Sequence, residues 1–328
     1  MLWLRLRRPR WGFWTTLLRQ VPRDCEAQPA NCPTDRSLLP TRGMVRQELA
    51  SVIRARGAAV MAVLNATPDS FFDGGAYFGK AAEARVHELV AQGADIVDIG
   101  GESSRPGSSP VSADEQLSRI EPAVRAAIAH QSVLVSVDTT RPDVAERVLS
   151  LGVHLINDVS CLADPELARV AARHGAGLVI MHCRGPMSAM EGFSAYPEAG
   201  YDDVVADVQR EWRAARERAL SAGMATEDVL FDPGFGFCKS ARQSLELLAR
   251  LSELSSLSPF MVVGPSRKSF IGSLDGTGPA ERLGGTIAAC LLAVQRGAHV
   301  LRVHDVQPVR QALSLMRALS PHQESGHA

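Results

Sequence analysis

The sequence predicts an α/β protein that consists of one (β/α)8 TIM barrel and an unstructured N-terminal extension. Eight short apolar runs follow residue 58, amphipathic segments separate these runs, and polar residues lie at the C-terminal end of nearly every run. Parallel strands that are covered by helices have this pattern. An open, doubly wound sheet is the alternative, but no GxGxxG sequence follows the first run.

The eight runs have the length and composition of buried parallel strands, with Val, Ile, Leu and Met predominating. In chain order they are AAVMAVLN, DIVDIG, VLVSVD, VHLIND, GLVIMH, VLFDPG, FMVVG and HVLRVH. A chain of 328 residues is long enough for one such barrel, since this fold typically takes about 250 residues.

Local signals mark where two of the intervening helices begin and end. Ser112 and Glu115 form a capping-box pattern at the start of one helix. Asp164 and Pro165 predict the N-cap and the first residue of another, and Gly175 predicts its end. The expected inward-facing residues are Leu117, Ile120, Val124 and Ile128 in the first helix and Leu167 and Val170 in the second.

The first 43 residues differ in composition from the rest of the chain. Positions 1–23 contain six Arg, three Trp and no acidic residue. This composition admits an organelle transit peptide, although a disordered or misassigned extension is the favoured interpretation. We therefore expect residues 1–43 to be an extension, residues 44–320 to form the barrel, and residues 321–328 to form a C-terminal tail.

The overall composition excludes several classes of function. The 35 basic and 36 acidic residues nearly cancel, which gives no indication of a nucleic-acid or membrane-surface partner. The six Cys lack metal-ligand spacing and are too sparse for a disulfide framework. No apolar run approaches the roughly 20 residues that span a bilayer. We expect a soluble, cytoplasmic protein that acts on small molecules.

Polar side chains at the strand ends predict an active site. In a TIM barrel the C-terminal ends of the strands meet at one rim, and active sites lie there. A single Asn or Asp at such a position often caps the next helix, and a lone His is more often structural, but here several such residues converge on one rim. They are Asn65, Asp138, Asn157, Asp232, the group Ser266 to Ser269, Arg302 and His304.

Three of these rim residues are rich in hydrogen-bond acceptors. Asp138, Asn157 and Asp232 end the third, fourth and sixth strands. Carboxylate and amide oxygens in a deep position suit the donor-rich edge of a flat, guanidine-like heterocycle. This group therefore predicts a pocket for a heteroaromatic ring.

A second group of rim residues predicts a pocket for an anion. Lys268, Arg302 and His304 supply hydrogen-bond donors and positive charge, and the Asn65 carbonyl supplies an oxygen. Such a pocket suits pyrophosphate, with Mg2+ as its companion, because oxygen ligands and phosphates suit this hard cation. The site could thus hold a ring and a polyanionic leaving group side by side.

The ordered segments around these residues resemble the dihydropteroate synthases over residues 58–320. The first of them, MAVLNATPDSFFDGG, includes the end of the first strand, and the others follow in the family's order. The matching segments are Met61 to Gly75, GGESSRPG at Gly100 to Gly107, SVDT at Ser136 to Thr139, IND at Ile156 to Asp158, DPGFGF at Asp232 to Phe237, SRKS at Ser266 to Ser269, and RVHD at Arg302 to Asp305.

The resemblance implies a role for each candidate residue. Asp73 and Lys268 would be catalytic. The residues implied for the pterin are Asp138, Asn157, Met181, Asp232 and Lys268, and those implied for the metal and pyrophosphate are Asn65, Arg302 and His304. Phe71 and Asp73 lie on one loop, Ser104, Arg105 and Pro106 lie on a second loop, and both would fold over para-aminobenzoate, whose carboxylate would lie at Ser269. The resemblance also suggests a homodimer formed through the late helices.

The sequence departs from the family pattern at positions that carry no charge. Ser104 stands where Thr is usual, and Cys161 and Cys238 stand where Gly is common. A side chain in place of Gly restricts the backbone angles. Cys238 therefore raises a question about the adjacent pterin loop.

Two other functions stay open. A methyltetrahydrofolate-dependent methyltransferase that acts on a corrinoid protein would share the acceptor residues, but it would not need the SRKS and RVH segments. A non-catalytic paralogue that binds pterin or a partner protein is the other alternative. The presence of Asn65, Arg105, Lys268, Arg302 and His304 together counts against this alternative.

The two covering loops predict that para-aminobenzoate binds after the pterin pyrophosphate. Residues 67–75 and 102–109 are rich in Gly, Ser, Asp and Pro. Ordering such loops costs on the order of 1 kcal/mol per residue, which a small aromatic acid cannot supply alone. Pyrophosphate can contribute through Arg105 and, with Mg2+, through Asn65. Calorimetric titration should show strong para-aminobenzoate binding only with pyrophosphate, pterin and Mg2+ present; equal affinity without them would contradict this order.

Overall fold

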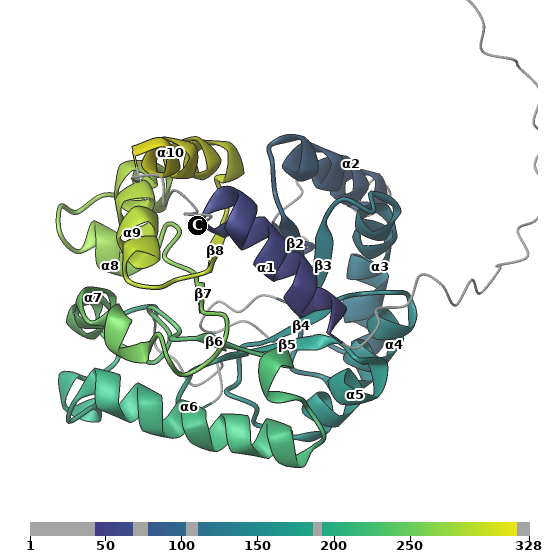
Figure 1. The fold of residues 1–328 in the computed structure, drawn as a ribbon, viewed down its shortest axis with the longest axis horizontal. Helices are drawn as coiled ribbons and strands as arrows, with labels where there is room; N and C mark the ends of the chain where they lie inside the picture. Colours follow the sequence, from purple (N-terminus) through teal and green to yellow (C-terminus); the bar gives the residue numbers. More distant parts are fainter. Residues whose placement is uncertain (1–42, 68–77, 103–110, 186–191, 320–328) are drawn as a thin grey trace, which may run out of the picture. The chain divides into compact units, whose positions relative to one another are not determined.

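Eight parallel strands form the predicted barrel, and each apolar run contains one of them (Figure 1). The structure is a computed structural model that describes residues 43–67, 78–102, 111–185 and 192–319. The strand order is β6-β5-β4-β3-β2-β1-β8-β7, and a parallel bridge from Phe231 to Met261 joins the two ends of the sheet. The strands are β1 Ala59–Asn65, β2 Ile96–Gly100, β3 Leu134–Asp138, β4 Leu155–Asp158, β5 Gly177–Met181, β6 Val229–Asp232, β7 Val262–Val263 and β8 Val300–Val303.

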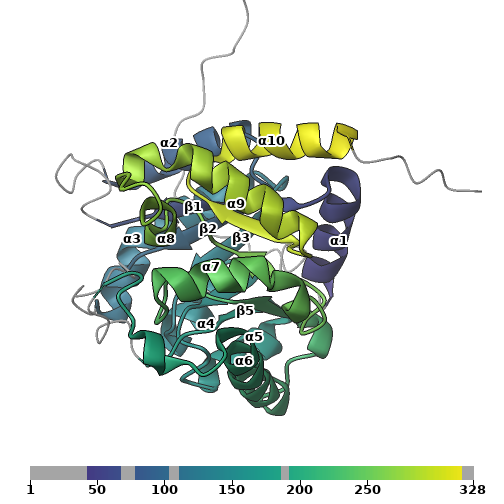
Figure 2. The same ribbon diagram turned by 90° about the vertical axis from the view of Figure 1, so that its left-hand side faces the viewer.

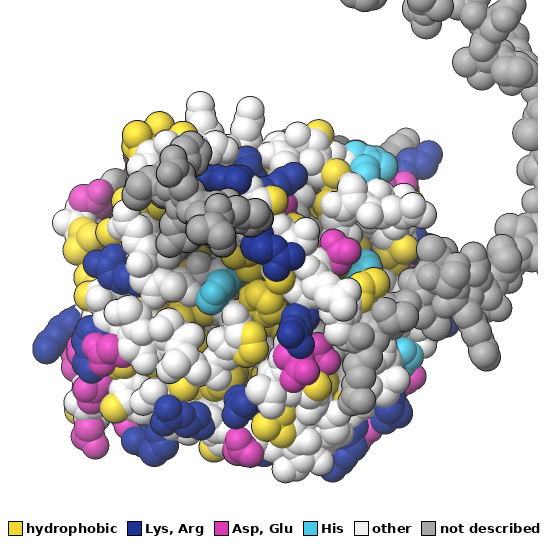
Figure 3. Space-filling view, viewed as in Figure 1, with side chains coloured by type: hydrophobic (Ala, Val, Ile, Leu, Met, Phe, Trp, Pro, Cys, Tyr) yellow, Lys and Arg dark blue, Asp and Glu magenta, His cyan; other side chains and the backbone are white. Residues whose placement is uncertain are grey.

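Helices cover the outside of the barrel, as two perpendicular views show (Figures 1 and 2). The α-helices of the described residues are α1 Met44–Arg56, α2 Phe78–Ala91, α3 Ala113–Ala129, α4 Pro142–Ser150, α5 Glu166–His174, α6 Val204–Ser221, α7 Ala241–Ala249, α8 Ser269–Gly272, α9 Leu283–Gln295 and α10 Val306–Leu319. Basic and acidic side chains are interspersed on the face around α1, in keeping with the nearly balanced charge (Figure 3). Within the described ranges, no helix has both the length and the apolar composition needed to cross a membrane.

One of the two hydrogen bonds of the predicted capping box is present at the start of α3. Ser112 Oγ accepts a hydrogen bond from Glu115 N–H at 3.2 Å, as an N-cap residue does. The Glu115 carboxylate, however, accepts from Arg119 Nε at 2.9 Å. The side chain that would complete a capping box is therefore engaged in an ion pair one turn further along the helix.

The boundaries of α5 differ from the prediction by one residue. Pro165 is the N-cap and the helix begins at Glu166, whereas the sequence placed the N-cap at Asp164. Asp164 still acts near the helix start, because its Oδ1 accepts from Glu166 N–H at 2.9 Å. Gly175 ends the helix with a φ of 65°, as predicted for a left-handed C-cap.

The half of the barrel interior at the N-terminal ends of the strands, here called the lower half, is apolar, and α1 closes it. Alternate residues of a strand point inward, so each strand contributes a residue to this layer. The layer consists of Ala59, Met61, Ile96, Leu134, Leu155, Val179, Leu230, Phe260, Val262 and Val300, together with Val45 and Leu49 of α1. The strand pattern does not predict this helix, although Val45, Leu49 and Ile53 have helical spacing. In Figure 1, α1 lies across the barrel.

Two histidines extend the hydrogen bonding between strands near this lower end. His154 directly precedes β4, and its Nδ1 accepts from Val135 N–H at 3.0 Å. His299 directly precedes β8, and its Nδ1 accepts from Met261 N–H at 3.1 Å. Burial lowers the pKa of His154 to about 4 and also lowers the pKa of His299. Both rings are therefore neutral acceptors in the folded protein.

These histidines predict that acid destabilises the barrel. In the unfolded chain His154 takes up a proton below its ordinary pKa of 6.5, but in the folded protein it does so only near 4. The unfolded state thus binds more protons in this window, and the free energy of unfolding should fall as the pH decreases through it. His154→Asn retains an acceptor that does not titrate. Urea unfolding should show a shallower pH dependence for this variant; equal slopes would contradict the prediction.

Candidate active site

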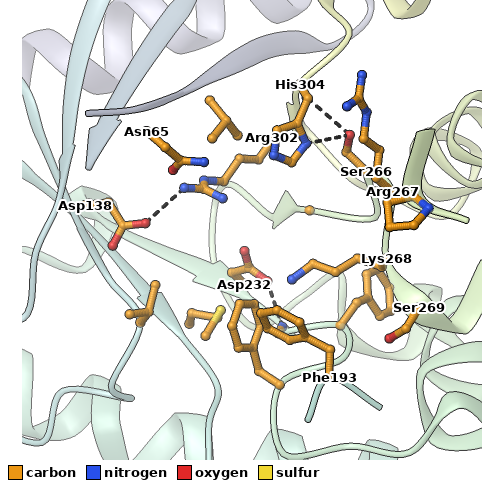
Figure 4. A pocket seen from close by; sticks show the side chains of 18 of the residues that line it. Asn65, Asp138, Phe193, Asp232, Ser266, Arg267, Lys268, Ser269, Arg302 and His304 are labelled. Carbon is orange, nitrogen blue, oxygen red and sulfur yellow. Dashed lines mark hydrogen bonds and ion pairs between the residues drawn. The ribbon is translucent and has the colours of Figure 1, made fainter. Parts of the chain in front are cut away.

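A cavity of about 800 Å³ opens at the C-terminal ends of the strands, where the sequence predicts the site (Figure 4). Every candidate residue that the structure describes lines it. These residues are Asn65, Asp138, Asn157, Met181, Asp232, Lys268, Ser269, Arg302 and His304. The candidates Phe71, Asp73, Ser104, Arg105 and Pro106 lie outside the described residues.

A buried ion cluster lies at the base of this cavity. Arg302 Nε donates to Asp98 Oδ2 at 2.7 Å, and Arg302 Nη2 donates to Asp138 Oδ2 at 2.9 Å. Asp98 also accepts from Ser136 Oγ at 2.6 Å and from Asn157 Nδ2 at 3.1 Å. The cluster joins β8 to β2, β3 and β4 through the barrel interior. It fixes the orientation of Asp138 and Asn157 before any ligand binds.

Asp98 belongs to the site although the sequence did not reveal it. The prediction considered residues at the strand ends, whereas Asp98 lies two residues before the end of β2. A usable signal was present, because Asp98 shares the inward face of its strand with Ile96 and is a charged residue in an otherwise apolar run. Its side chain is fully buried. Buried carboxylates of this kind require a charged or hydrogen-bonding partner.

The two predicted acceptor carboxylates are shifted toward their protonated forms. Burial raises the pKa of Asp138 to about 7, and the positive charge of Arg302 acts in the opposite direction. Burial also raises the pKa of Asp232, and the hydrogen bond from Gly234 N–H to Oδ1, 2.7 Å long, opposes this shift. A ligand that donates hydrogen bonds to these carboxylates would favour their charged forms.

Lys268 brings a second positive charge into the cavity. Its ammonium lies 3.7 Å from the ring centroid of Phe237 and 5.0 Å from that of Phe193. It makes no ion pair with a carboxylate in the described ranges, although Figure 4 shows it extending toward Asp232. Burial, followed by repulsion from Arg302, lowers its pKa to about 7. An anionic ligand would therefore promote its protonation.

His304 is a neutral hydrogen-bonding group at the opposite side of Arg302 from Asp138 (Figure 4). Burial, with a further contribution from Arg302, lowers its pKa to about 4. Its Nδ1 lies 3.0 Å from Ser266 Oγ, which also accepts from the His304 backbone N–H at 3.2 Å. An unprotonated Nδ1 that accepts from Ser266 leaves the proton on Nε2, so Nε2 can donate to a ligand.

The two predicted chemical groups share one cavity and are in direct contact. Arg302, expected to serve the anion, is bonded to Asp138, expected to serve the heterocycle. The sequence predicted that the two groups lie side by side in one site, but it did not predict this contact, because sequence order gives no information on contacts between β3 and β8. Phe193 and Phe237 were also missed, and they add an apolar wall beside Met181.

Ser269 and Asn65 lie at the cavity in different settings. Ser269 begins α8, which has four residues, and its hydroxyl donates to Ser194 Oγ at 2.7 Å. Asn65 ends β1 and is exposed, in contrast to the six buried residues before it. Its amide is thus accessible to a ligand or a hydrated cation.

Comparisons with known proteins agree with this geometry. The family described as "Pterin binding enzyme" matches residues 61–304. The chain is 41% identical over 261 residues to the dihydropteroate synthase of Escherichia coli (strain K12), covering 79% of this chain and 90% of the relative. The matched range runs from β1 to the end of the RVH segment and contains all the cavity residues described above.

Two solved structures extend this similarity to the fold. The dihydropteroate synthase of Xanthomonas albilineans with 4-aminobenzoic acid has a TM-score of 0.74 and 40% identity, covering 80% of this chain and 93% of that chain. The enzyme of Thermus thermophilus in complex with 6HMPPP has a TM-score of 0.68 and 43% identity, covering 80% of this chain and 94% of that chain.

The buried ion cluster predicts a large stability loss when Asp98 is neutralised. Asp98→Asn leaves Arg302 with one carboxylate, and breaking a buried pair typically costs about 3 to 5 kcal/mol. Asp143→Asn is the matched control, because Asp143 pairs with Arg141 at the surface and exposed pairs contribute about 0 to 1 kcal/mol. Urea unfolding should show the difference; similar losses for the two variants would contradict the proposed importance of the cluster.

Proposed function

This chain belongs to the pterin binding enzyme family, and we propose that it is a dihydropteroate synthase. This transferase of folate biosynthesis condenses 6-hydroxymethyl-7,8-dihydropterin pyrophosphate with para-aminobenzoate to give 7,8-dihydropteroate and pyrophosphate. The observation that carries the proposal is the single cavity in which acceptors for a heterocycle lie beside Lys268, Arg302 and His304. The similarity to enzymes solved with 4-aminobenzoic acid and with 6HMPPP supports it.

The pterin ring is proposed to lie against the acceptor residues. Asp138, Asn157 and Asp232 present oxygens to the donor-rich ring edge, and Met181 and Phe237 supply apolar contacts. The ring's N–H groups would replace water that hydrates these carboxylates. Charge-assisted hydrogen bonds of this kind stabilise the charged carboxylate and hold the ring in one orientation.

The pyrophosphate is proposed to lie beside Lys268, Arg302 and His304. Asp98 and Asp138 engage Nε and Nη2 of Arg302, so Nη1 has no carboxylate partner among the described residues and could donate to a phosphate oxygen. The neutral His304 would donate from Nε2, and Lys268 would add a positive charge once protonated. These groups stabilise the negative charge that develops on the departing pyrophosphate.

The reaction needs no protein nucleophile. The amine nitrogen of para-aminobenzoate attacks the methylene carbon of the pterin, the bond from this carbon to the pyrophosphate oxygen breaks, and the new secondary amine loses one proton to water. The positive charge that develops on the pterin would be stabilised by the negative charges of Asp138 and Asp232, once the bound ring has displaced water from them. Lys268 lies close to both components and is the proposed catalytic residue among those described.

Mg2+ is the proposed cofactor, and the donors in the cavity fit it. Asn65 offers an amide oxygen that is accessible at the end of β1. The described residues contain no cluster of three or more His, Cys, Asp or Glu that could hold a metal ion by themselves. A single amide oxygen is compatible with Mg2+, which commonly takes one or two protein oxygens and fills its remaining positions with substrate phosphate and water. When bound, it would neutralise charge on the pyrophosphate.

The para-aminobenzoate pocket is proposed to be completed by residues of the two covering loops. Ser269 lies at the cavity, and its hydroxyl is a candidate contact for the carboxylate. The loop candidates Phe71, Asp73, Ser104, Arg105 and Pro106 rest on the sequence resemblance. Asp73 is the proposed catalytic residue among them.

A homodimer in the cytoplasm is the proposed state of the protein. Apolar side chains on α9 and α10 support the dimer, because large exposed apolar residues are typical of interfaces. Leu292 of α9 is 40% exposed, and Leu315 and Leu319 of α10 are 63% and 75% exposed. The family resemblance suggests a dimer through the late helices, and α9 and α10 are late helices of this chain.

A pyrophosphate-release assay tests the proposed reaction. Release should require the pterin pyrophosphate, para-aminobenzoate and Mg2+ together, and mass spectrometry should identify dihydropteroate. Omitting para-aminobenzoate is the control for simple hydrolysis. Pterin binding without release would favour the non-catalytic paralogue, and methyl transfer from methyltetrahydrofolate to a corrinoid protein would favour the methyltransferase.

Asp138→Asn should abolish or strongly weaken pterin binding. The amide replaces a charged acceptor with a mixed donor and acceptor facing ring N–H groups, and losing this interaction should cost roughly 2 to 4 kcal/mol. Calorimetry on the full chain should show the loss, while the exposed control Asp143→Asn should bind normally. An unchanged affinity in a folded Asp138→Asn protein would remove this assignment.

A further inference from the structure

Two cysteines are in contact behind Met181 and Phe237, which line the cavity. Cys183 follows β5, and Cys238 follows the DPGFGF segment after β6. Their sulfur atoms are 3.2 Å apart, although 55 positions separate them in the chain. Both residues are buried, with exposed fractions of 6% and 2%. No disulfide links them in the structure.

Hydrogen bonds hold the segments that carry the two sulfur atoms. In its thiol form Cys238 donates to the Arg184 carbonyl at 2.9 Å, and the single S–H of Cys183 can donate either to the Gly185 carbonyl, 3.6 Å away, or to Cys238 Sγ. Tyr201 O–H donates to the Cys238 carbonyl at 2.9 Å. The proximity of the thiols is therefore supported by contacts on both segments.

A buried lysine lies beside this thiol pair. Lys239 Nζ donates to the carbonyl oxygens of Gly234 and Phe237 at 3.1 and 3.0 Å and lies 3.0 Å from His182 Nδ1. These partners are neutral, and Lys239 makes no ion pair with a carboxylate in the part of the chain that the structure describes. Its ammonium thus favours a negative charge nearby, and a thiolate can supply that charge.

The electrostatics of Cys238 agree with this geometry. The hydrogen bond from Cys183, together with the charge of Lys239, lowers the pKa of Cys238 to about 6, although burial opposes the shift. The pKa of Cys183 is raised, first by its interaction with Cys238 and then by burial. One thiol of the pair is therefore the better nucleophile, and the other keeps its proton.

Cys238 also has an unusual backbone conformation. Its φ is 48°, in the left-handed region that favours Gly. A side chain at such a position is strained unless its surroundings stabilise it. Here the sulfur is engaged by Cys183 and by the Arg184 carbonyl, so the contacts that stabilise the side chain are those of the thiol itself.

We propose that Cys183 and Cys238 are a modification site at which hydrogen peroxide forms a disulfide. The Cys238 thiolate attacks one peroxide oxygen, giving a sulfenic acid and a hydroxide that takes up a proton to become water. Cys183 then attacks the sulfenic sulfur, loses its proton, and displaces a second water. Two thiols are oxidised by two electrons in total, and one peroxide is reduced to two waters.

The disulfide would form directly beneath the cavity wall. Met181 and Phe237 line the cavity and pack in the same cluster as the two thiols, so the disulfide would lie behind these two side chains. A disulfide is about 2.05 Å long, and the sulfurs would therefore approach by roughly 1 Å. The bond would tie the segment after β5 to the segment after β6 and restrict the wall.

Peptide mapping of the full-length protein tests the proposal. The reduced protein is treated with an equimolar amount of hydrogen peroxide, and the remaining thiols are alkylated after denaturation. We expect two of the six thiols to be lost and a Cys183–Cys238 linked peptide to appear, which dithiothreitol removes. The melting temperature should rise on oxidation, because the bond closes a long loop.

Two variants control the experiment. Cys183→Ser should prevent both the linked peptide and the rise in melting temperature, whereas Cys290→Ser should leave both unchanged, because Cys290 lies in α9. Wild-type protein that keeps all six thiols, or that links Cys161 to either cysteine, would overturn the proposal. These readouts do not depend on catalysis, so they stand apart from the test of the proposed function.

Discussion

Arg302 places a permanent positive charge inside the barrel, and the rest of the site depends on how this charge is compensated. A guanidinium removed from water is costly unless carboxylates and hydrogen bonds replace its hydration. Asp98 and Asp138 provide that replacement from β2 and β3. The same charge contributes to the lowered pKa of Lys268 and of His304. One ion cluster thus sets the strand alignment, the acceptor geometry and the protonation of its neighbours.

Much of the fold and of the site could be predicted because parallel strands impose simple rules. Apolar runs predicted the eight strands, and their polar ends predicted eight of the nine candidates that line the cavity, since strand ends converge on one rim; Met181 came from the resemblance. Asp98 was missed because its importance depends on the inward face of β2. The contact between Arg302 and Asp138 joins residues 164 positions apart, and no local pattern encodes it. Phe193 lies in an irregular segment before α6 and has no periodic signal.

Two groups of the site have pKa values near neutral pH, so a bound ligand can change their protonation. Burial shifts Asp138 and Lys268 toward their neutral forms, each with a pKa of about 7. A ligand with donors on one side and negative charge on the other would reverse both shifts. Binding would therefore move protons as well as order side chains. Ligand binding and protonation are linked because burial in the cavity shifts the pKa of both groups.

The position of α1 determines at which end molecules can enter and leave the cavity. Val45 and Leu49 complete the apolar layer beneath the polar half of the barrel, so the described residues leave no passage through that end of the interior. Within the described part of the chain, the cavity is therefore closed at its base and opens at the rim. Water expelled by an incoming molecule and product that leaves must share this entrance. A molecule bound near the rim would therefore prevent a molecule at the base of the cavity from leaving.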